Sequence, residues 1–148
     1  MQIETAHFGR VEIADEALIH FPRGLYGIEG TRDYCLLPHD SRGHFQWLQA
    51  TDAPAIAMVV TDPFLHFPAY EVEISDEACD LLQATSSADV TIYTSITVAA
   101  DRTGIFANLL GPIAINHGAR RGMQLIQDAA RYTTRHRIGA PLAAEAAA

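Results

Sequence analysis

The sequence contains no lysine, because all ten of its basic residues are arginine. A P-loop, a Schiff-base site and a Ser-Lys dyad each need a lysine side chain, so none of these sites can be built from this chain. The nucleophile motif G-x-S-x-G is also missing. These absences remove several large classes of enzyme.

Cysteine and long apolar runs are scarce as well. Cys35 and Cys79 are far apart, and no CxxC motif is present. We expect two buried thiols in a reducing compartment rather than a disulfide or a redox pair. No run of about 18 apolar residues occurs, and the first sixteen residues carry charges where a signal peptide has an apolar stretch. We therefore predict a cytoplasmic protein with no membrane interaction.

Seven histidines raise the question of a metal site. None of them forms HxH, HExxH or a histidine–carboxylate pattern at helical spacing. His39 and His44 flank a short turn and could approach each other, but loop histidines without such a pattern are mostly solvated. We predict no metal and no other cofactor.

Acidic residues outnumber basic ones by 18 to 10, which gives a net charge of −8. Residues 1–100 hold 15 acids and 4 arginines, whereas residues 101–148 hold 3 acids and 6 arginines. Because phosphate binding needs a basic surface, we expect no direct binding of nucleic acid. The densest acidic stretch, residues 61–80, has six acids and no basic residue. It is either a solvated face or a docking surface for a basic partner.

Short β-type segments dominate the chain. Residues 90–99 alternate with period two and are rich in β-branched side chains, residues 69–75 alternate as well, and residues 55–60 form a short apolar run. Turn-forming residues separate such segments, which predicts a mainly β fold, a single antiparallel β-barrel-like domain. The further expected strands are 2–6, 10–13, 18–21, 34–37, 45–49, 105–110, 112–116 and 123–127.

One short helix is expected near residues 76–84. Ser75 is a good N-cap, and Asp76 and Glu77 would lie in the first turn, where the helix dipole favours negative charge. The end of the chain, residues 139–148, has low complexity and no packing pattern, so we expect a disordered, alanine-rich tail after a domain that spans residues 1–138.

Acid–base catalysis is harder to exclude, because carboxylates are abundant. The mouth of a barrel could pair Asp62 with His66. Asp62 is equally well explained as a turn residue before Pro63, where aspartate is favoured locally. A small β-barrel enzyme with an acid/base site near Asp62 and His66 therefore stays as the alternative to a protein-binding module.

Residues 107–116 read ANLLGPIAIN, an apolar run that contains two asparagines and a Gly-Pro pair. The amides of Asn108 and Asn116 can satisfy backbone groups at strand ends or turns, and Pro112 confines that point to a sheet edge or a bulge. Gly111 suits a bulge. We interpret the segment as structural, because none of its side chains can carry out chemistry and a kinked strand must satisfy its backbone.

Five segments, in order along the chain to about residue 138, resemble the FliW family of bacterial flagellar assembly factors. They read FPRGLYGIEG, FQWLQATD, MVVTDPFLHFPAYEVEI, ANLLGPIAIN and MQLIQDAARYTTRH. Tyr26 stands where the family usually has proline, and Ile28 where it usually has phenylalanine. The positions that we take as its structural signature are Gly24, Gly27, Pro63, Asn108, Pro112 and Asn116.

The resemblance implies a β-barrel-like protein that is not an enzyme. Members of the family bind CsrA, a basic RNA-binding regulator that blocks translation of flagellin mRNA, and they also bind flagellin. Flagellin occupies the family member while it accumulates, and its secretion frees that protein to bind CsrA, which then releases the mRNA. The acidic excess of this chain fits such a basic partner.

We expect the partner to dock on the acidic stretch, with the acids as a steering rim around an apolar anchor formed by Phe64 and Phe67. The residues expected to bind the partner are Asp62, Phe64, Phe67, Tyr70, Glu71, Glu73, Asp76 and Glu77.

Deletion of residues 140–148 should change the melting temperature by less than about 2 °C, because a tail that buries nothing contributes little to stability. Calorimetric melting of the full-length and the shortened protein tests this expectation. A drop of many degrees would show that the tail packs against the domain.

Overall fold

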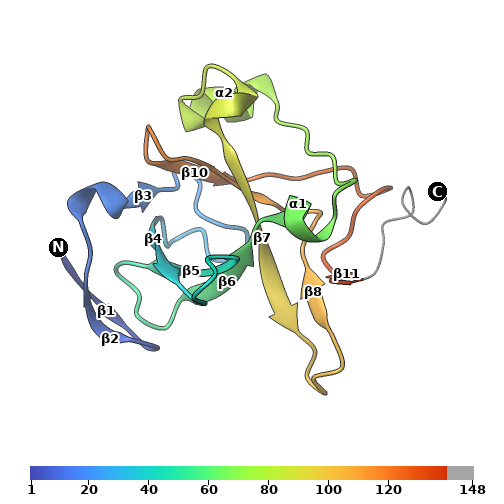
Figure 1. Ribbon diagram of the computed structural model, residues 1–148. Helices are drawn as coiled ribbons and strands as arrows, with labels where there is room; N and C mark the ends of the chain where they lie inside the picture. Colours follow the sequence, from blue (N-terminus) through green and yellow to red (C-terminus); the bar gives the residue numbers. More distant parts are fainter. Residues whose placement is uncertain (140–148) are drawn as a thin grey trace.

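The computed structural model describes residues 1–139, so the tail expected at the end of the chain lies, apart from Gly139, outside the described residues. The domain consists of short strands and two short helices (Figure 1). The strands are β1 (Gln2–Thr5), β2 (Gly9–Glu12), β3 (Ile19–His20), β4 (Asp33–Pro38), β5 (Phe45–Ala50), β6 (Ala57–Thr61), β7 (Thr91–Val98), β8 (Ile105–Ala107), β9 (Ile113–Asn116), β10 (Arg121–Gln124) and β11 (His136–Arg137). The helices are α1 (Pro63–His66) and α2 (Asp76–Leu82), and single 3-10 turns cover Asp15–Ala17 and Ser87–Asp89.

Seven of these strands form a closed ring. Its order is β7-β6-β5-β4-β3-β10-β9, and β9 pairs again with β7, with Ile115 opposite Thr91 and Ile113 opposite Tyr93. All neighbours in the ring are antiparallel except β3 and β10, which meet as a parallel pair at His20 and Arg121. A closed ring leaves no strand edge open within it. The expected mainly β, antiparallel, barrel-like fold is confirmed.

Strand β7 pairs with three other strands. Its first residues pair with β9, Thr94 and Ser95 pair with β6, and Ile96–Val98 pair with β8. The second half of β7 therefore leaves the ring together with β8, and β11 adds a short outer edge to β8. Figure 1 shows this β7–β8 ribbon projecting from the ring.

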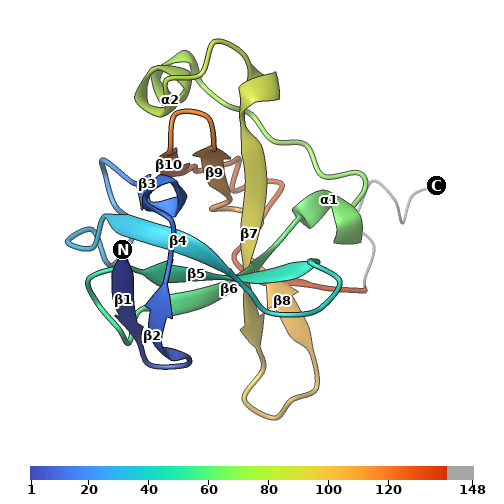
Figure 2. The same ribbon diagram turned by 60° about the vertical axis from the view of Figure 1, so that its left-hand side comes forward.

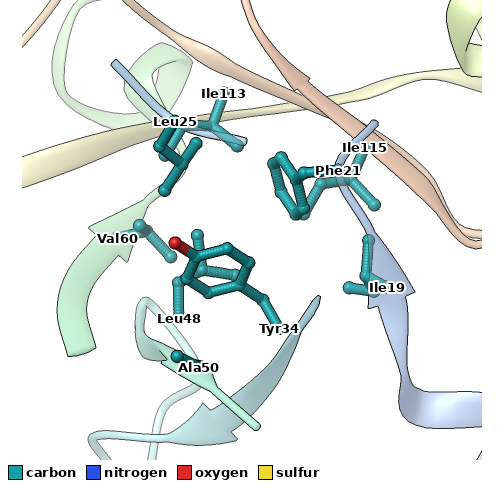
Figure 3. Packing of buried hydrophobic residues seen from close by; sticks show 9 residues of the cluster. All are labelled: Ile19, Phe21, Leu25, Tyr34, Leu48, Ala50, Val60, Ile113 and Ile115. Atoms are coloured by element: carbon teal, nitrogen blue, oxygen red, sulfur yellow. The ribbon is translucent and has the colours of Figure 1, made fainter. Parts of the chain in front are cut away.

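The interior of the ring is filled by one apolar cluster. Side chains from strands around the ring point toward one another (Figure 3), and Tyr34 stacks edge-on against Phe21 with ring centroids 5.2 Å apart. This arrangement follows from the period-two alternation of the strands, which sends every second side chain inward. The members are Ile19, Phe21, Leu25, Tyr34, Leu48, Ala50, Val60, Ile113 and Ile115.

Smaller apolar clusters cover the outside of the ring. The β1–β2 hairpin packs Ile3 and Ile13 against Cys35 of β4, and α2 packs Ala78 and Leu82 against β7, β9 and the chain after β10. Both ribbon views place α2 beside β10, far from the hairpin (Figures 1 and 2). Among residues 1–139, no helix is both long and apolar enough to cross a bilayer.

Two expectations about local structure were wrong. Residues 69–75 were expected to form a strand, and although Tyr70 is buried and Glu71 and Glu73 are exposed, the segment pairs with no strand within the described part of the chain. Alternation indicates that one face of a segment is buried, but it does not indicate which groups form hydrogen bonds with its backbone. The second difference is the extra helical turn α1, which begins with Pro63 at a position where the missing N–H costs nothing.

The buried hydroxyl groups of two tyrosines give a matched test of the core. Tyr34 is fully buried and its Oη has no hydrogen-bond partner among residues 1–139, whereas Oη of Tyr70 donates to the Leu109 carbonyl at 2.6 Å. Tyr34→Phe should leave the free energy of unfolding unchanged or raise it by about 1 kcal/mol, and Tyr70→Phe should lower it by about 1 kcal/mol. Urea unfolding of both variants checks this; equal losses would contradict it.

Stability should also decrease as the pH falls below about 6.5. His66 and His136 are half-buried, and burial lowers the pKa of both imidazoles. In His136, Nε2 accepts a hydrogen bond from the Thr133 N–H at 2.9 Å, which requires a neutral ring. Below about pH 6.5 the unfolded chain therefore binds more protons than the folded protein. The contribution of these neutral histidines to the free energy of unfolding is fully present above pH 6.5, and it decreases as the pH falls to the lowered pKa of the folded state. Chemical unfolding between pH 7.5 and 5 measures this slope, and His136→Asn should reduce it.

Candidate protein-docking surface

The acidic segment, defined here as residues 71–77, is held in place by side chains rather than by a strand. The Glu71 N–H donates to Tyr132 Oη at 3.2 Å. The Glu73 N–H donates to Gln127 Oε1 at 2.8 Å, and Gln127 Nε2 donates back to the Glu73 carbonyl at 3.0 Å. This two-way bond replaces the missing strand partner, so the backbone is fixed and both carboxylates project into solvent.

Helix α2 continues the acidic segment and is fixed at both ends. Ser75 Oγ accepts a hydrogen bond from the Ala78 N–H at 3.1 Å, as expected for an N-cap. At the other end, Nδ2 of Asn116 donates to the carbonyls of Leu82 and Gln83 at 3.0 and 3.2 Å. Helix carbonyls at this end have no partner within the helix, so the amide of Asn116 satisfies two of them.

The four carboxylates of the acidic segment differ in how they are compensated. Glu71 pairs with Arg131 at 3.3 Å and Glu77 with Arg23 at 2.7 Å. Among the described residues, Glu73 and Asp76 have no ion pair, and both are exposed. The exposed pairs contribute little to stability. Glu73 and Asp76 therefore present uncompensated negative charge at fixed positions.

The acidic segment borders an open hollow of about 470 Å³. Residues 73–75 and Ala78 form one wall, and Tyr26 and residues 123–126 form the other. Tyr26 and Ile126 are 61% and 60% exposed, the highest values among the large apolar side chains of the described chain.

Tyr26 and Ile126 are missing from the residues that the sequence predicts to bind the partner. One signal was available: Ile126 follows the inward-facing Leu125 and so puts an apolar side chain on an outward position.

The three aromatic side chains of the expected docking stretch differ in their exposure. Phe64 on α1 is 41% exposed, but Phe67 is 1% exposed and Tyr70 4%. Both buried rings belong to the cluster around Leu109, and the hydroxyl of Tyr70 is used inside that cluster. Phe67 and Tyr70 are therefore core residues, and no partner can reach them without unfolding this part of the protein.

Asp62 and His66 lie at opposite ends of the helical turn α1. Oδ1 of Asp62 accepts the Phe64 N–H at 2.9 Å and so caps the turn, and His66 Nε2 lies 3.3 Å from the hydroxyl of Thr61. Within residues 1–139 no hydrogen bond joins the two side chains, and no group of three histidine, cysteine or carboxylate side chains is placed to hold a metal. The arrangement gives Asp62 a capping role.

The glycines of the loop after β3 adopt backbone conformations that other residues avoid. Gly24 has φ of +65°, and a Cβ at this position would lie 2.7 Å from the backbone of Glu29. Gly27 has φ of +90°, and its N–H donates to the carboxylate of Glu29 at 3.0 Å. This loop carries Tyr26 to the rim of the hollow.

The segment 107–116 interrupts a strand that would otherwise follow β7 throughout. Between the pairs Ile96–Ala107 and Tyr93–Ile113, β7 has two residues and the partner chain has five. Oδ1 of Asn108 closes this excursion by accepting the Gly111 N–H at 2.9 Å.

Pro112 stands at the end of the excursion, and its carbonyl accepts the Leu125 N–H at 2.8 Å. The excursion, defined as residues 108–112, has few unsatisfied backbone groups because neighbouring segments bind it. The carbonyl of Leu110 accepts the Gln127 N–H at 2.8 Å, and the carbonyl of Gly111 accepts Gln124 Nε2 at 2.9 Å.

Comparison with known proteins extends the resemblance to the whole domain. Residues 2–138 match the FliW protein family. The flagellar assembly factor FliW of Moorella thermoacetica is 39% identical over 139 residues, 93% of this chain and 88% of that protein, and its counterpart from Anoxybacillus flavithermus is 40% identical over 139 residues, 93% and 94% of the two chains. A crystal structure of the flagellar assembly factor FliW has a TM-score of 0.84 at 34% identity and covers 93% of this chain and 96% of its own. Sequence and fold together show that this chain belongs to the FliW family of flagellar assembly factors.

Proposed function

We propose that this protein is a cytoplasmic, non-enzymatic regulator of flagellar assembly that binds CsrA and flagellin in exchange for one another. Bound to CsrA, it relieves the repression of flagellin mRNA translation. Flagellin occupies the protein while it accumulates, and secretion of flagellin frees the protein for CsrA. Membership of the FliW family and the acidic surface support this assignment.

The observation that carries the proposal is the pair of uncompensated carboxylates, Glu73 and Asp76. Their backbone is held by Gln127 and by the cap of α2, so the segment that carries the two carboxylates is already hydrogen-bonded when a partner arrives. A basic protein such as CsrA is attracted to such a field before contact, which raises the rate of encounter. Nucleic acid is repelled by the same field.

An acid/base enzyme finds less support. Asp62 uses its carboxylate to cap α1, and within residues 1–139 no hydrogen bond joins it to His66. The hollow beside the acidic segment is open, and among the described residues that line it Glu73 is the one charged side chain. A catalytic site is expected to bring several polar groups together in a concave pocket.

Neutralising the two unpaired carboxylates should slow the association with CsrA. The double variant Glu73→Gln/Asp76→Asn should reduce the association rate constant by about three- to tenfold at low salt, because the steering field is weakened. The wild-type rate should fall as salt rises, and the rate of the variant should depend less on salt, because exposed charges are screened over roughly 8 Å at physiological ionic strength. Stopped-flow mixing of the purified proteins at several salt concentrations measures both.

A matched control removes the same charge elsewhere. Glu16 and Asp52 are exposed and, in the described part of the chain, form no ion pair. They lie on the first 3-10 turn and on the β5–β6 connection. Glu16→Gln/Asp52→Asn should therefore change the rate much less. Equal effects of the two double variants, with both proteins folded by circular dichroism, would mean that only net charge matters and that the acidic segment is not the docking surface.

A further inference from the structure

We propose that the hollow beside the acidic segment is an anchor site that takes one apolar side chain of the basic partner, from a segment in which arginine or lysine stands next to that side chain. This inference rests on the proposed binding of CsrA and specifies which contact holds the complex once it has formed.

Polar and apolar groups line the hollow in equal measure, and its apolar part comes from residues that three distant segments bring together. Tyr26 comes from the loop after β3, Ile74 from the acidic segment, and Met123 and Ile126 from β10 and the chain that follows it. Single exposed apolar side chains are common on protein surfaces, but the two most exposed large ones of the described chain flank the same hollow.

Hydrogen bonds hold the backbone of both sides of the hollow in the free protein. On one side, the Tyr26 N–H donates to Gln124 Oε1 at 2.9 Å, and Gln124 Nε2 donates to the Gly111 carbonyl at 2.9 Å. On the other side, Glu73 is held by the two hydrogen bonds of Gln127. A site that is already ordered loses little entropy on binding, so the burial of an apolar side chain contributes more fully to affinity.

Charge decides which kind of apolar segment fits. Glu73 lies in the wall of the hollow, and Asp76 follows at the start of α2. An acidic or neutral segment would leave these carboxylates partly desolvated without compensation, whereas a basic residue next to the apolar one pairs with them. The exposed ring of Tyr26 can also accept a guanidinium over its face. The occupant is therefore an apolar side chain flanked by cations.

The carboxylates of the acidic segment and the apolar residues of the hollow should affect different rate constants. Long-range attraction by Glu73 and Asp76 acts before contact and sets the association rate, whereas apolar burial between Tyr26 and Ile126 acts only after contact and sets the dissociation rate. Apolar burial is also insensitive to screening by salt, so the two contributions separate in a single titration of salt concentration.

The test is the dissociation rate of the complex with CsrA, measured by surface plasmon resonance for Tyr26→Ala and Ile126→Ser. Both side chains are exposed, so the variants should fold normally. Each should raise the dissociation rate constant by at least about tenfold while the association rate constant and its salt dependence change by less than about twofold. Tyr26→Phe should bind like the wild type. Val98→Ser, which removes an exposed apolar side chain from the β7–β8 ribbon, is the matched control and should have no effect.

Two results would overturn the inference in different ways. If the wild-type protein binds CsrA and both hollow variants dissociate at the wild-type rate, or if they change only the association rate, the hollow is not the anchor, and the proposed function stands. If the wild-type protein does not bind CsrA at all, the proposed function and the anchor both fail.

Discussion

Strand β7 pairs with β9 through its first residues, with β6 through its middle and with β8 through its last, and the rest of the structure depends on this shared pairing. The β7–β9 pairs close the ring around the core of Tyr34 and Phe21. The β7–β8 pairs carry the chain out of the ring. One edge of β7 can serve both strands only because the chain between them makes the excursion 108–112.

The excursion also links the barrel to the acidic surface. Its carbonyls at Leu110 and Pro112 accept hydrogen bonds from the chain after β10, which positions Leu125 and Gln127. Gln127 in turn holds Glu73 by two hydrogen bonds. The backbone geometry of an apolar segment without reactive groups therefore places a carboxylate on the surface about 35 residues away in sequence, and Asn116 does the same for the end of α2.

Side chains rather than a neighbouring strand hold the acidic segment in place, and this affects how its carboxylates are compensated. A strand in a ladder would place Glu71 and Glu73 beside the side chains of a neighbouring strand, where they would find partners. The segment here runs alone over the core, with Tyr70 buried beneath it, so its outer face has no neighbour in the sheet. Arg131 pairs with Glu71, and among residues 1–139 Glu73 has no ion pair. The result is a negative charge on a hydrogen-bonded backbone, next to a hollow that two exposed apolar side chains, Tyr26 and Ile126, help to line.

The sequence by itself determined the strands with period-two alternation, the helix that begins after Ser75, the uneven charge and the family to which the chain belongs. Each of these features follows from residues that are close together in the sequence, because alternation, capping and charge density are local properties. Only the tertiary structure decided that residues 69–75 are not a strand, since the backbone N–H groups of Glu71 and Glu73 bind the side chains of Tyr132 and Gln127 and not the backbone of a neighbouring strand. It also buried Phe67 while leaving Phe64 exposed, although both are phenylalanines of one short stretch. The hollow lined by Tyr26 and Ile126 exists only because the fold brings the loop of Tyr26 next to β10, where the Tyr26 N–H donates to Gln124, 98 positions away, and no local pattern carries that information.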